Sequence, residues 1–293
     1  MSEMTRRVGF GVVAAPLALA IVVYGGAALA ALLAVASALA AWEFYRIAKT
    51  AGHAPLSDVG AALAGLTPLA VHARYLGLWQ PHYSYFAAVL ICLLGIALWA
   101  RGATGNPLGA VAVTVLGVLY TAGLLSFGYA LRYHDYAAGG IWIGPVEVAA
   151  GAVLLGLPIL LTWASDIGAF LTGRLFGGKK LMPSVSPGKT VAGAVGGIAA
   201  SVVVAWLYSR FALRPAAQLT FTTTGILVFS VTISGVAQVG DLVESLFKRE
   251  AGVKDSSTLI PGHGGVLDRL DSLFFVLPTA HLMLRWLLIP APR

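Results

Sequence analysis

Long, uninterrupted runs of apolar residues constrain this chain more than any other feature. Residues 26–42 and 84–100, for example, contain no charged side chain. A helix that crosses a membrane needs roughly 17 to 25 such residues, and lipid offers no partner to backbone groups outside a helix or a closed barrel. Because the chain is 58% hydrophobic and only 11% charged, it lacks the polar surface of a soluble domain. We therefore expect an all-α, polytopic membrane helix bundle.

Apolar runs of sufficient length predict about nine transmembrane helices. If the N-terminus lies in the cytosol, every lysine falls on the inner side, as the positive-inside rule requires. The two longest polar segments, 174–189 and 248–265, then also face the cytosol. We expect an active site at the cytosolic ends of the later helices. The expected spans are 8–24, 26–42, 57–73, 84–100, 108–130, 147–172, 191–211, 220–247 and 267–289.

The chain is expected to divide by role near residue 145. Residues 1–145 would anchor the protein and could supply dimer contacts, whereas 146–293 carry the acidic and basic residues of a catalytic region. The net charge of +7 is explained by inner-face lysines meeting anionic lipid headgroups, so no nucleic acid is expected as a partner. The single cysteine, Cys92, excludes a disulfide framework and a cysteine metal site.

Three aspartates lie toward the inner ends of predicted spans, where charged side chains are costly and are candidates for function. Asp241 is near the end of the eighth span and Asp268 begins the ninth, so an antiparallel helix pair would bring both carboxylates to one depth. Mg²⁺ prefers such oxygen ligands and keeps substrate phosphates in its shell. We predict a magnesium site at Asp241 and Asp268, with Asp166 as a further contributor. A second metal or a monovalent cation is left open.

Two glycine-containing loops provide candidate phosphate contacts. In the PGHGG turn, glycines would let backbone N–H groups approach an anion. The SPGKT turn presents Ser, Lys and Thr at the start of the seventh span, where a helix N-terminus favours phosphate. A Walker A loop is excluded because its glycine spacing and preceding strand are missing. The candidate residues are Arg174, Ser186, Lys189, Thr190, Lys248, Arg249, Lys254, His263, Gly264, Gly265 and Arg269.

The run from Ser245 to Asp271 resembles the signature of the phosphatidate cytidylyltransferase family, also called CDP-diacylglycerol synthases. The defined positions of that signature are filled, through Lys248-Arg249 and His263-Gly264-Gly265 to Asp268-Arg269. The segment from Asp166 to Thr190 is similar to the family's second block. The chain departs from the family at Ala192, because the family usually has a glutamate there.

The resemblance implies a polytopic, homodimeric enzyme of a bacterial inner membrane that converts CTP and phosphatidate to CDP-diacylglycerol and pyrophosphate. Asp241 and Asp268 would then hold the metal, with Asp166 contributing. Catalytic contacts to phosphates would come from Lys189, Lys248 and Arg269. Substrate positioning would fall to Arg174, Ser186, Thr190, Arg249, Lys254, His263, Gly264 and Gly265.

Two other functions fit parts of the pattern. A related lipid transferase, such as a CDP-archaeol synthase or a CTP-dependent polyprenol kinase, would use similar residues. A small-anion transporter is a less favoured alternative, because transporters place ionisable groups near the membrane midplane, whereas the carboxylates here cluster at helix ends.

Overall fold

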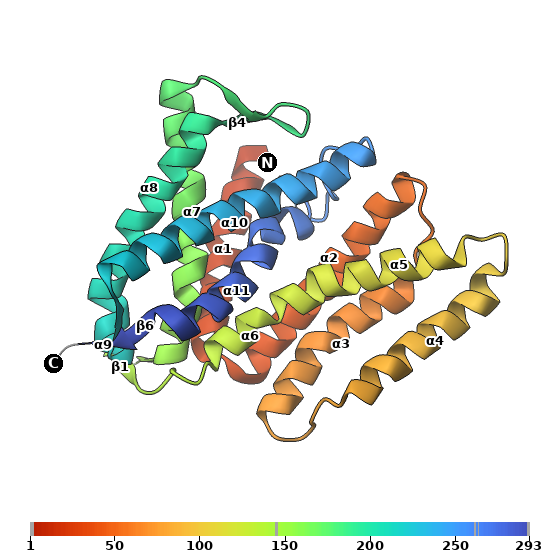
Figure 1. Ribbon diagram of the computed structural model, residues 1–293, viewed down its shortest axis with the longest axis horizontal. Helices are drawn as coiled ribbons and strands as arrows, with labels where there is room; N and C mark the ends of the chain where they lie inside the picture. Colours follow the sequence, from red (N-terminus) through yellow and green to blue (C-terminus); the bar gives the residue numbers. More distant parts are fainter. Residues whose placement is uncertain (1–2, 144–145, 261, 263, 292–293) are drawn as a thin grey trace. The chain divides into compact units, whose positions relative to one another are not determined.

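A computed structural model describes residues 3–143, 146–260, 262 and 264–291. The chain is mostly helical, which confirms the predicted all-α class (Figure 1). A π-helical turn follows α5 at η1 (Leu119–Gly123), and another, η2 (Ser209–Leu213), joins α8 to α9. The α-helices are α1 (Glu3–Tyr24), α2 (Gly26–Thr50), α3 (Ser57–Tyr75), α4 (Tyr83–Arg101), α5 (Pro107–Val118), α6 (Phe127–Arg132), α7 (Ala150–Phe176), α8 (Val191–Tyr208), α9 (Arg214–Ala217), α10 (Thr223–Glu250) and α11 (Leu267–Leu287).

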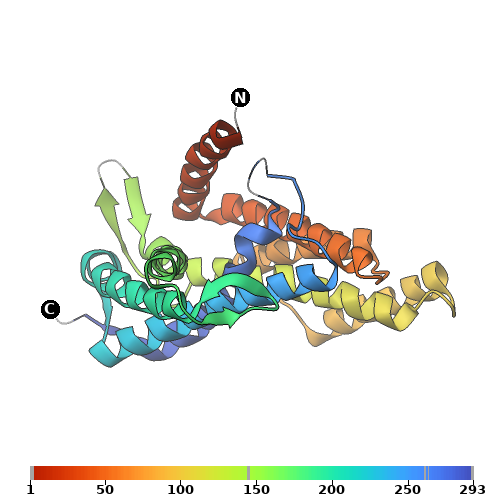
Figure 2. The same cartoon turned by 90° about the horizontal axis from the view of Figure 1, so that it is seen from above.

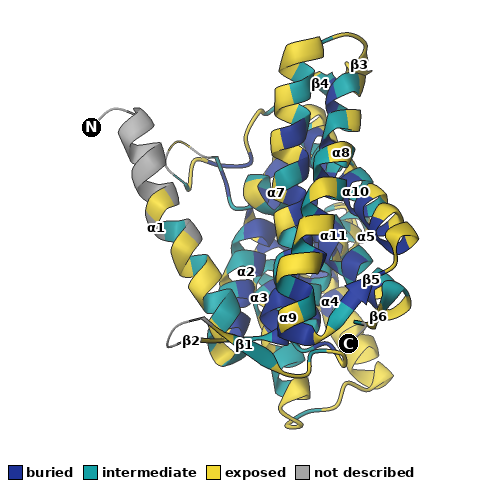
Figure 3. Ribbon diagram, turned by 90° about the vertical axis from the view of Figure 1, so that its left-hand side faces the viewer, coloured by how far each residue is buried: buried dark blue, intermediate teal, exposed yellow. Residues whose placement is uncertain are grey.

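Every predicted span coincides with a helix when α5 to α6 and α8 to α9 are each taken as one continuous element. Six of the helices in the described chain are long and apolar enough to cross a membrane: α2, α4, α5 to α6, α7, α8 to α9, and α10. Six helices of this kind indicate an integral membrane protein. Exposed positions recur along α7 and α8 (Figure 3), and large apolar residues such as Phe170 and Val195 occupy them. Apolar surface of this kind suits lipid rather than water.

Two short antiparallel hairpins and one antiparallel pair of strands from distant segments join the helices, and the sequence pattern did not predict them. The first, yellow-green in Figure 2, precedes α7. The second lies between α7 and α8, and the third joins the segment before α10 to the end of α11. The paired strands are β1 (Gly140–Ile143) with β2 (Val146–Ala149), β3 (Lys180–Met182) with β4 (Ser186–Thr190), and β5 (Leu219–Phe221) with β6 (Leu288–Pro290).

The chain forms two compact units that interleave along the sequence. The first contains Met1–Ala18, Gly26–Tyr129 and Phe247–Arg269, and the second contains Leu19–Gly25, Ala130–Leu246 and Leu270–Arg293. The division of roles near residue 145 stays a prediction, and the units follow a different boundary. The segment Phe247–Arg269 folds with the N-terminal helices, because a side chain of α2 binds it, as described below.

A buried tyrosine of α2 organises the first unit. Tyr45 is fully buried, and its hydroxyl donates a hydrogen bond to the carbonyl of Thr114 at 2.7 Å. Its ring lies against Gly60 of α3 and Gly117 of α5, where an added Cβ would collide with it. Glycines at these two positions therefore let three helices pack around one aromatic ring.

Small residues bring the helices of the second unit close together. A Cβ added at Gly168 of α7 would lie 2.6 Å from the Cβ of Ala200 on α8, so the two backbones approach directly. The Oγ atoms of Ser165 and Ser234 lie 2.7 Å apart and tie α7 to α10. Both serines are buried, so each satisfies the other's hydroxyl away from solvent. This packing fixes the faces of α7 and α10 that carry Asp166 and Asp241.

Candidate active site

A cavity of about 540 Å³ lies at the β3–β4 end of the second unit. Three elements supply its polar lining: α7 contributes Asp166 and Arg174, β4 contributes Lys189, and α10 contributes Asp241. Gly173 lies opposite Thr190, and a Cβ at Gly173 would come within 3.0 Å of the threonine hydroxyl. The glycine therefore lets the end of α7 approach the start of α8 and closes the cavity on that side.

Lys189 and Asp241 form an ion pair inside this cavity. Lys189 Nζ lies 2.7 Å from Asp241 Oδ2, and Ser245 Oγ donates to Asp241 Oδ1 at 3.2 Å. The side chains of Lys189 and Asp241 are 26% and 36% exposed, so the pair is open to the cavity rather than sealed in the core. Asp166 is exposed and lines the same cavity. The cavity thus offers two carboxylates and two cationic groups to a charged ligand.

The SPGKT segment forms β4 rather than an open turn. Thr190 pairs with Lys180 and Ser186 with Met182 across the hairpin. The hydroxyl of Thr190 accepts a hydrogen bond from the Gly193 N–H at 3.0 Å and so caps α8. Thr190 is buried, and its structural role is to start the helix with Lys189 directed to the cavity. Ser186 is half-buried and lies outside the residues that line the cavity.

The donor set of the cavity fits a magnesium ion. Within the described residues, no group of three or more His, Cys, Asp or Glu side chains could hold a metal. Mg²⁺ does not need one, since it is usually held by one or two carboxylates and completes its shell with water and substrate phosphates. Asp166 and Asp241 line one solvent-open cavity and can supply those carboxylates.

The family signature segment folds in the first unit around Asp268. Asp268 Oδ1 pairs with Lys248 Nζ at 2.7 Å, and the Asp268 side chain is 8% exposed. Asp268 Oδ2 accepts hydrogen bonds from the Ser256 hydroxyl at 2.8 Å and from the Gly265 N–H at 2.8 Å. These contacts draw the end of α10, the loop and the start of α11 onto one carboxylate.

Two glycines of this loop are required by its geometry. Gly264 has φ +80°, a left-handed conformation that favours glycine, and a Cβ there would lie 2.6 Å from Asp268 Oδ2. At Gly265 a Cβ would collide with Ser256 Oγ and lie 2.5 Å from both carboxylate oxygens of Glu43. The predicted role of Gly264 and Gly265 in holding substrate stays a prediction. His263 lies outside the described residues.

Glu43 of α2 is the residue of this region that the sequence reasoning did not single out. Its carboxylate is fully buried and accepts a hydrogen bond from Ser257 Oγ at 2.5 Å. Ser256 Oγ lies 3.1 Å from Glu43 Oε2 and shares its one hydroxyl proton between Glu43 and Asp268. It also accepts the backbone N–H groups of Leu267 at 2.6 Å and Val266 at 3.1 Å, at the start of α11. The sequence signal that could have identified Glu43 is its position at the end of the apolar run 26–42. A carboxylate there is energetically costly unless it has a partner.

The predicted site residues therefore fall into two groups. The second unit brings together Asp166, Arg174, Lys189, Thr190 and Asp241. The proposed pairing of Asp241 with Asp268 stays a prediction, since the two belong to different units. The first unit brings together Lys248, Gly264, Gly265 and Asp268, with Arg249, Lys254 and Arg269 exposed on the same segment.

Replacing Asp268 tests this local arrangement. Asp268→Asn is expected to abolish turnover and to loosen the loop, because an amide nitrogen would face donors that now bind a carboxylate. Lys248 would also lose its partner at 2.7 Å. Activity and protease sensitivity of the loop are the two measurements. An Asp268→Asn enzyme that keeps its activity would remove this aspartate from the site.

The departure at Ala192 makes a milder prediction. Ala192 is half-buried in the first turn of α8, and its carbonyl accepts a hydrogen bond from Thr172 Oγ1 at 3.3 Å. Ala192→Glu should keep activity within about threefold, since an acidic side chain in a first helical turn is favoured by the helix dipole. Measured turnover checks this expectation. An inactive variant would show that the surrounding site has been rebuilt to exclude the glutamate.

Comparison with known proteins identifies the family of the chain. Residues 5–287 match the model of a cytidylyltransferase family. Proteins named phosphatidate cytidylyltransferase from Synechocystis and Bacillus subtilis are 30% and 32% identical over 94% and 97% of this chain, and over 95% and 98% of their own. One of that name from Haemophilus influenzae is 48% identical over 128 residues, 44% of each chain. The chain thus spans under half of the Haemophilus protein in that match and nearly all of the other two. A match along almost the whole chain, including both segments that build the site, shows that the chain belongs to the cytidylyltransferase family.

Proposed function

We propose that the protein is a CTP:phosphatidate cytidylyltransferase that produces CDP-diacylglycerol and pyrophosphate for phospholipid synthesis. The observation that carries the proposal is the cavity in which Asp166 and Asp241 lie with Lys189 and Arg174. Cationic groups for phosphates and carboxylates for a metal are what a nucleotidyl transfer requires. The family of the chain and the names of its relatives support the same reaction.

The reaction needs positioning and charge neutralisation more than proton transfer. A phosphate oxygen of phosphatidate attacks the α-phosphorus of CTP and forms the new P–O bond. The bond from that phosphorus to the oxygen leading to the β-phosphorus breaks, and pyrophosphate leaves with the electron pair. Because a phosphate monoester is anionic at neutral pH, no general base is required. Lys189 and Arg174 would bind phosphate oxygens and offset the charge that accumulates as pyrophosphate departs.

A magnesium ion would be held by Asp241 and Asp166, and Asp268 is the further carboxylate proposed for it. When bound, the metal supplies Lewis-acid stabilisation of the leaving phosphates. Asp241 keeps Lys189 in place through their ion pair at 2.7 Å, and Ser245 orients the same carboxylate. In this proposal the protein therefore holds the charged groups of Lys189 and Asp241 in position before the substrates bind.

The proposed setting is a bacterial inner membrane with the active site facing the cytosol, the side on which CTP is found. Nine crossings with the N-terminus inside would place every lysine on that side. The bacterial sources of the relatives support this setting. A homodimer, with contacts supplied by residues 1–145, remains part of the proposal.

The proposal is tested with the purified full-length protein. The protein is incubated with Mg²⁺, with CTP radiolabelled in the cytidine moiety or, in parallel, at the γ-phosphate, and with one acceptor at a time: phosphatidate, an archaeal ether-lipid phosphate or dolichol. Label from the cytidine moiety is expected in lipid only with phosphatidate, and pyrophosphate should appear in equal amount. Lipid labelling only with one of the other acceptors would replace the proposed substrate.

A further inference from the structure

A second polar cavity lies at the other end of α8, far from Lys189. Its volume is about 420 Å³, and it is formed by the end of α8, η2, α9, β5 and the start of α10, all within the second unit. The 18 residues of α8 lie between Lys189 of the first cavity and Arg210 of the second, a length of about 27 Å at 1.5 Å per residue. That length is close to the hydrocarbon thickness of a bilayer, about 30 Å. The two cavities therefore suit opposite boundaries of the membrane.

Two arginines give this second cavity a strong positive charge. Arg210 and Arg214 line it, and Arg214 Nε donates a hydrogen bond to Thr220 Oγ1 at 3.3 Å. Ser209 Oγ lies 3.2 Å from the same Thr220 hydroxyl, and both Ser209 and Thr220 are buried. In the part of the chain that the structure describes, neither guanidinium group forms an ion pair with a carboxylate. Two neighbouring cations are thus held at a built site that lacks a protein counter-charge.

The backbone at this cavity departs from a regular helix. α8 passes into the π-helical turn η2, which carries Ser209 and Arg210. Such turns are rare, and they occur frequently at functional sites because they change the direction of side chains. Here the turn precedes Arg214, the first residue of α9, so both arginines lie at the same mouth. The π-helical turn is an observation separate from the positive charge of the arginines, and both indicate that this cavity is a functional site.

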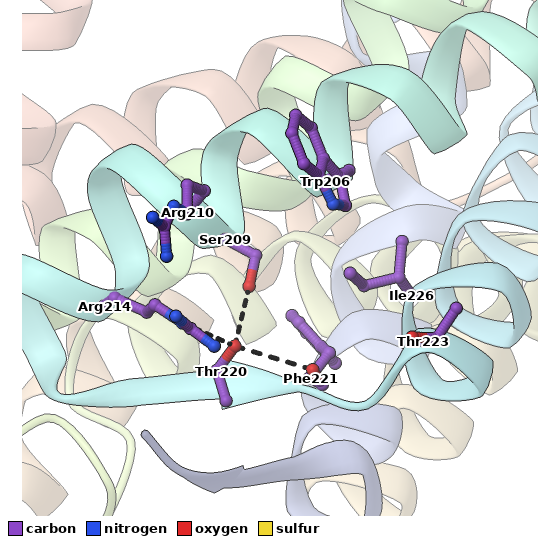
Figure 4. Close-up of a pocket in the computed structure, with 8 residues that line it drawn as sticks. All are labelled: Trp206, Ser209, Arg210, Arg214, Thr220, Phe221, Thr223 and Ile226. Carbon is purple, nitrogen blue, oxygen red and sulfur yellow. Dashed lines mark hydrogen bonds between the residues drawn. The ribbon is translucent and has the colours of Figure 1, made fainter. Parts of the chain in front are cut away.

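The cavity also has an apolar side. Figure 4 shows the two guanidinium groups on one side, with Thr220 beside Arg214, and Trp206 and Ile226 on the other side. Trp206 is 56% exposed, and tryptophans of this kind are typical of the membrane–water boundary. Exposed apolar side chains continue along the same two helices at Val203 and Leu227. A ligand that fits must therefore be anionic at one end and apolar at the other.

We propose that this cavity binds the phosphate of an anionic glycerophospholipid, with the acyl chains lying toward Trp206 and Ile226. A planar guanidinium group can donate two parallel hydrogen bonds to two oxygens of one phosphate. This preference explains why the cations that line the cavity are arginines and not lysines. A free phosphate ion shares the charge but uses none of the apolar surface, so the lipid is the better fit. The site is separate from the proposed catalytic cavity and does not depend on the reaction carried out there.

Lipid binding by the purified full-length protein tests the proposal. Native mass spectrometry would follow retained lipid as phosphatidylglycerol, phosphatidylcholine or inorganic phosphate is added. The wild type should retain phosphatidylglycerol in preference to phosphatidylcholine. Affinity should fall about tenfold in the Arg210→Gln/Arg214→Gln variant, because charge-assisted hydrogen bonds to the phosphate are lost. Arg74→Gln, which removes an exposed arginine of the first unit, is the matched control and should bind as the wild type does.

Arg210→Gln alone is a second variant that should fold normally, since Arg210 is exposed and its side chain makes no hydrogen bond to the described residues. It should show a smaller loss of phosphatidylglycerol than the double variant. Equal affinity of the double variant and the wild type would overturn the proposal, as would equal retention of the two lipids. Binding of inorganic phosphate in place of phosphatidylglycerol would overturn the assignment to a lipid.

Discussion

Asp241→Asn is expected to lower turnover by at least about a hundredfold while leaving a folded membrane protein. The substitution keeps the shape of the side chain but removes its charge. Lys189 then loses the carboxylate that lies 2.7 Å from its Nζ, and the cavity loses one of its two carboxylates. Because Asp241 is about one-third exposed, the folded state does not rely on it as on a core residue. Initial rates of CTP-dependent lipid labelling give the measurement.

A matched variant separates this effect from a general change of charge. Asp58→Asn makes the same substitution at an exposed position in the first turn of α3, and its activity should remain near that of the wild type. The Mg²⁺ dependence adds a second measurement: residual activity of Asp241→Asn should require a higher Mg²⁺ concentration. Full activity of Asp241→Asn at the wild-type Mg²⁺ requirement would exclude this residue from the proposed metal site.

Most helices could be predicted from the sequence, because six of those in the described chain are apolar runs of membrane length. The expected span 84–100 and the observed α4 (Tyr83–Arg101), for instance, differ by one residue at each end. The hairpin β3–β4 could not be predicted, since its strands are only three and five residues long and mostly exposed. Local pattern does not distinguish such strands from a turn. Lys189 lies on the second strand of this hairpin and lines the cavity. Its position in the site therefore depends on an element that hydrophobic periodicity does not predict.

The candidate site divides in a similar way. Asp166, Lys189 and Asp241 were predicted from charge at helix ends, and they do line one cavity. Glu43 was missed because its partners lie more than two hundred residues away in the sequence, at Ser256, Ser257 and the start of α11. Helix periodicity reports neighbours within a few turns only. A contact between residues so far apart in the sequence depends on how the helices pack, and a single sequence does not reveal that packing.

Glu43→Gln is expected to release the signature loop and to lower activity at least about tenfold, because buried donors left without a partner cost about 1–3 kcal/mol each. Four donors now converge on the carboxylate: two serine hydroxyls and the N–H groups of Val266 and Leu267. An amide offers one acceptor oxygen and turns a donor toward the rest. Ser256 shares its one hydroxyl proton between Glu43 and Asp268, so the disturbance should reach the ion pair of Asp268 with Lys248. Hydrogen exchange at the Val266 and Leu267 amides measures the release directly.

Glu250→Gln provides the control for this substitution within the same unit. Glu250 is exposed, and its carboxylate lies 3.5 Å from His53 Nε2, so removal of its charge should cost little. Exchange at Val266 and Leu267 should be faster in Glu43→Gln and unchanged in Glu250→Gln. If both amides stay protected in Glu43→Gln, the carboxylate does not hold the loop. A loss of activity with protection intact would instead place Glu43 in direct contact with substrate, because the loop would then have kept its structure.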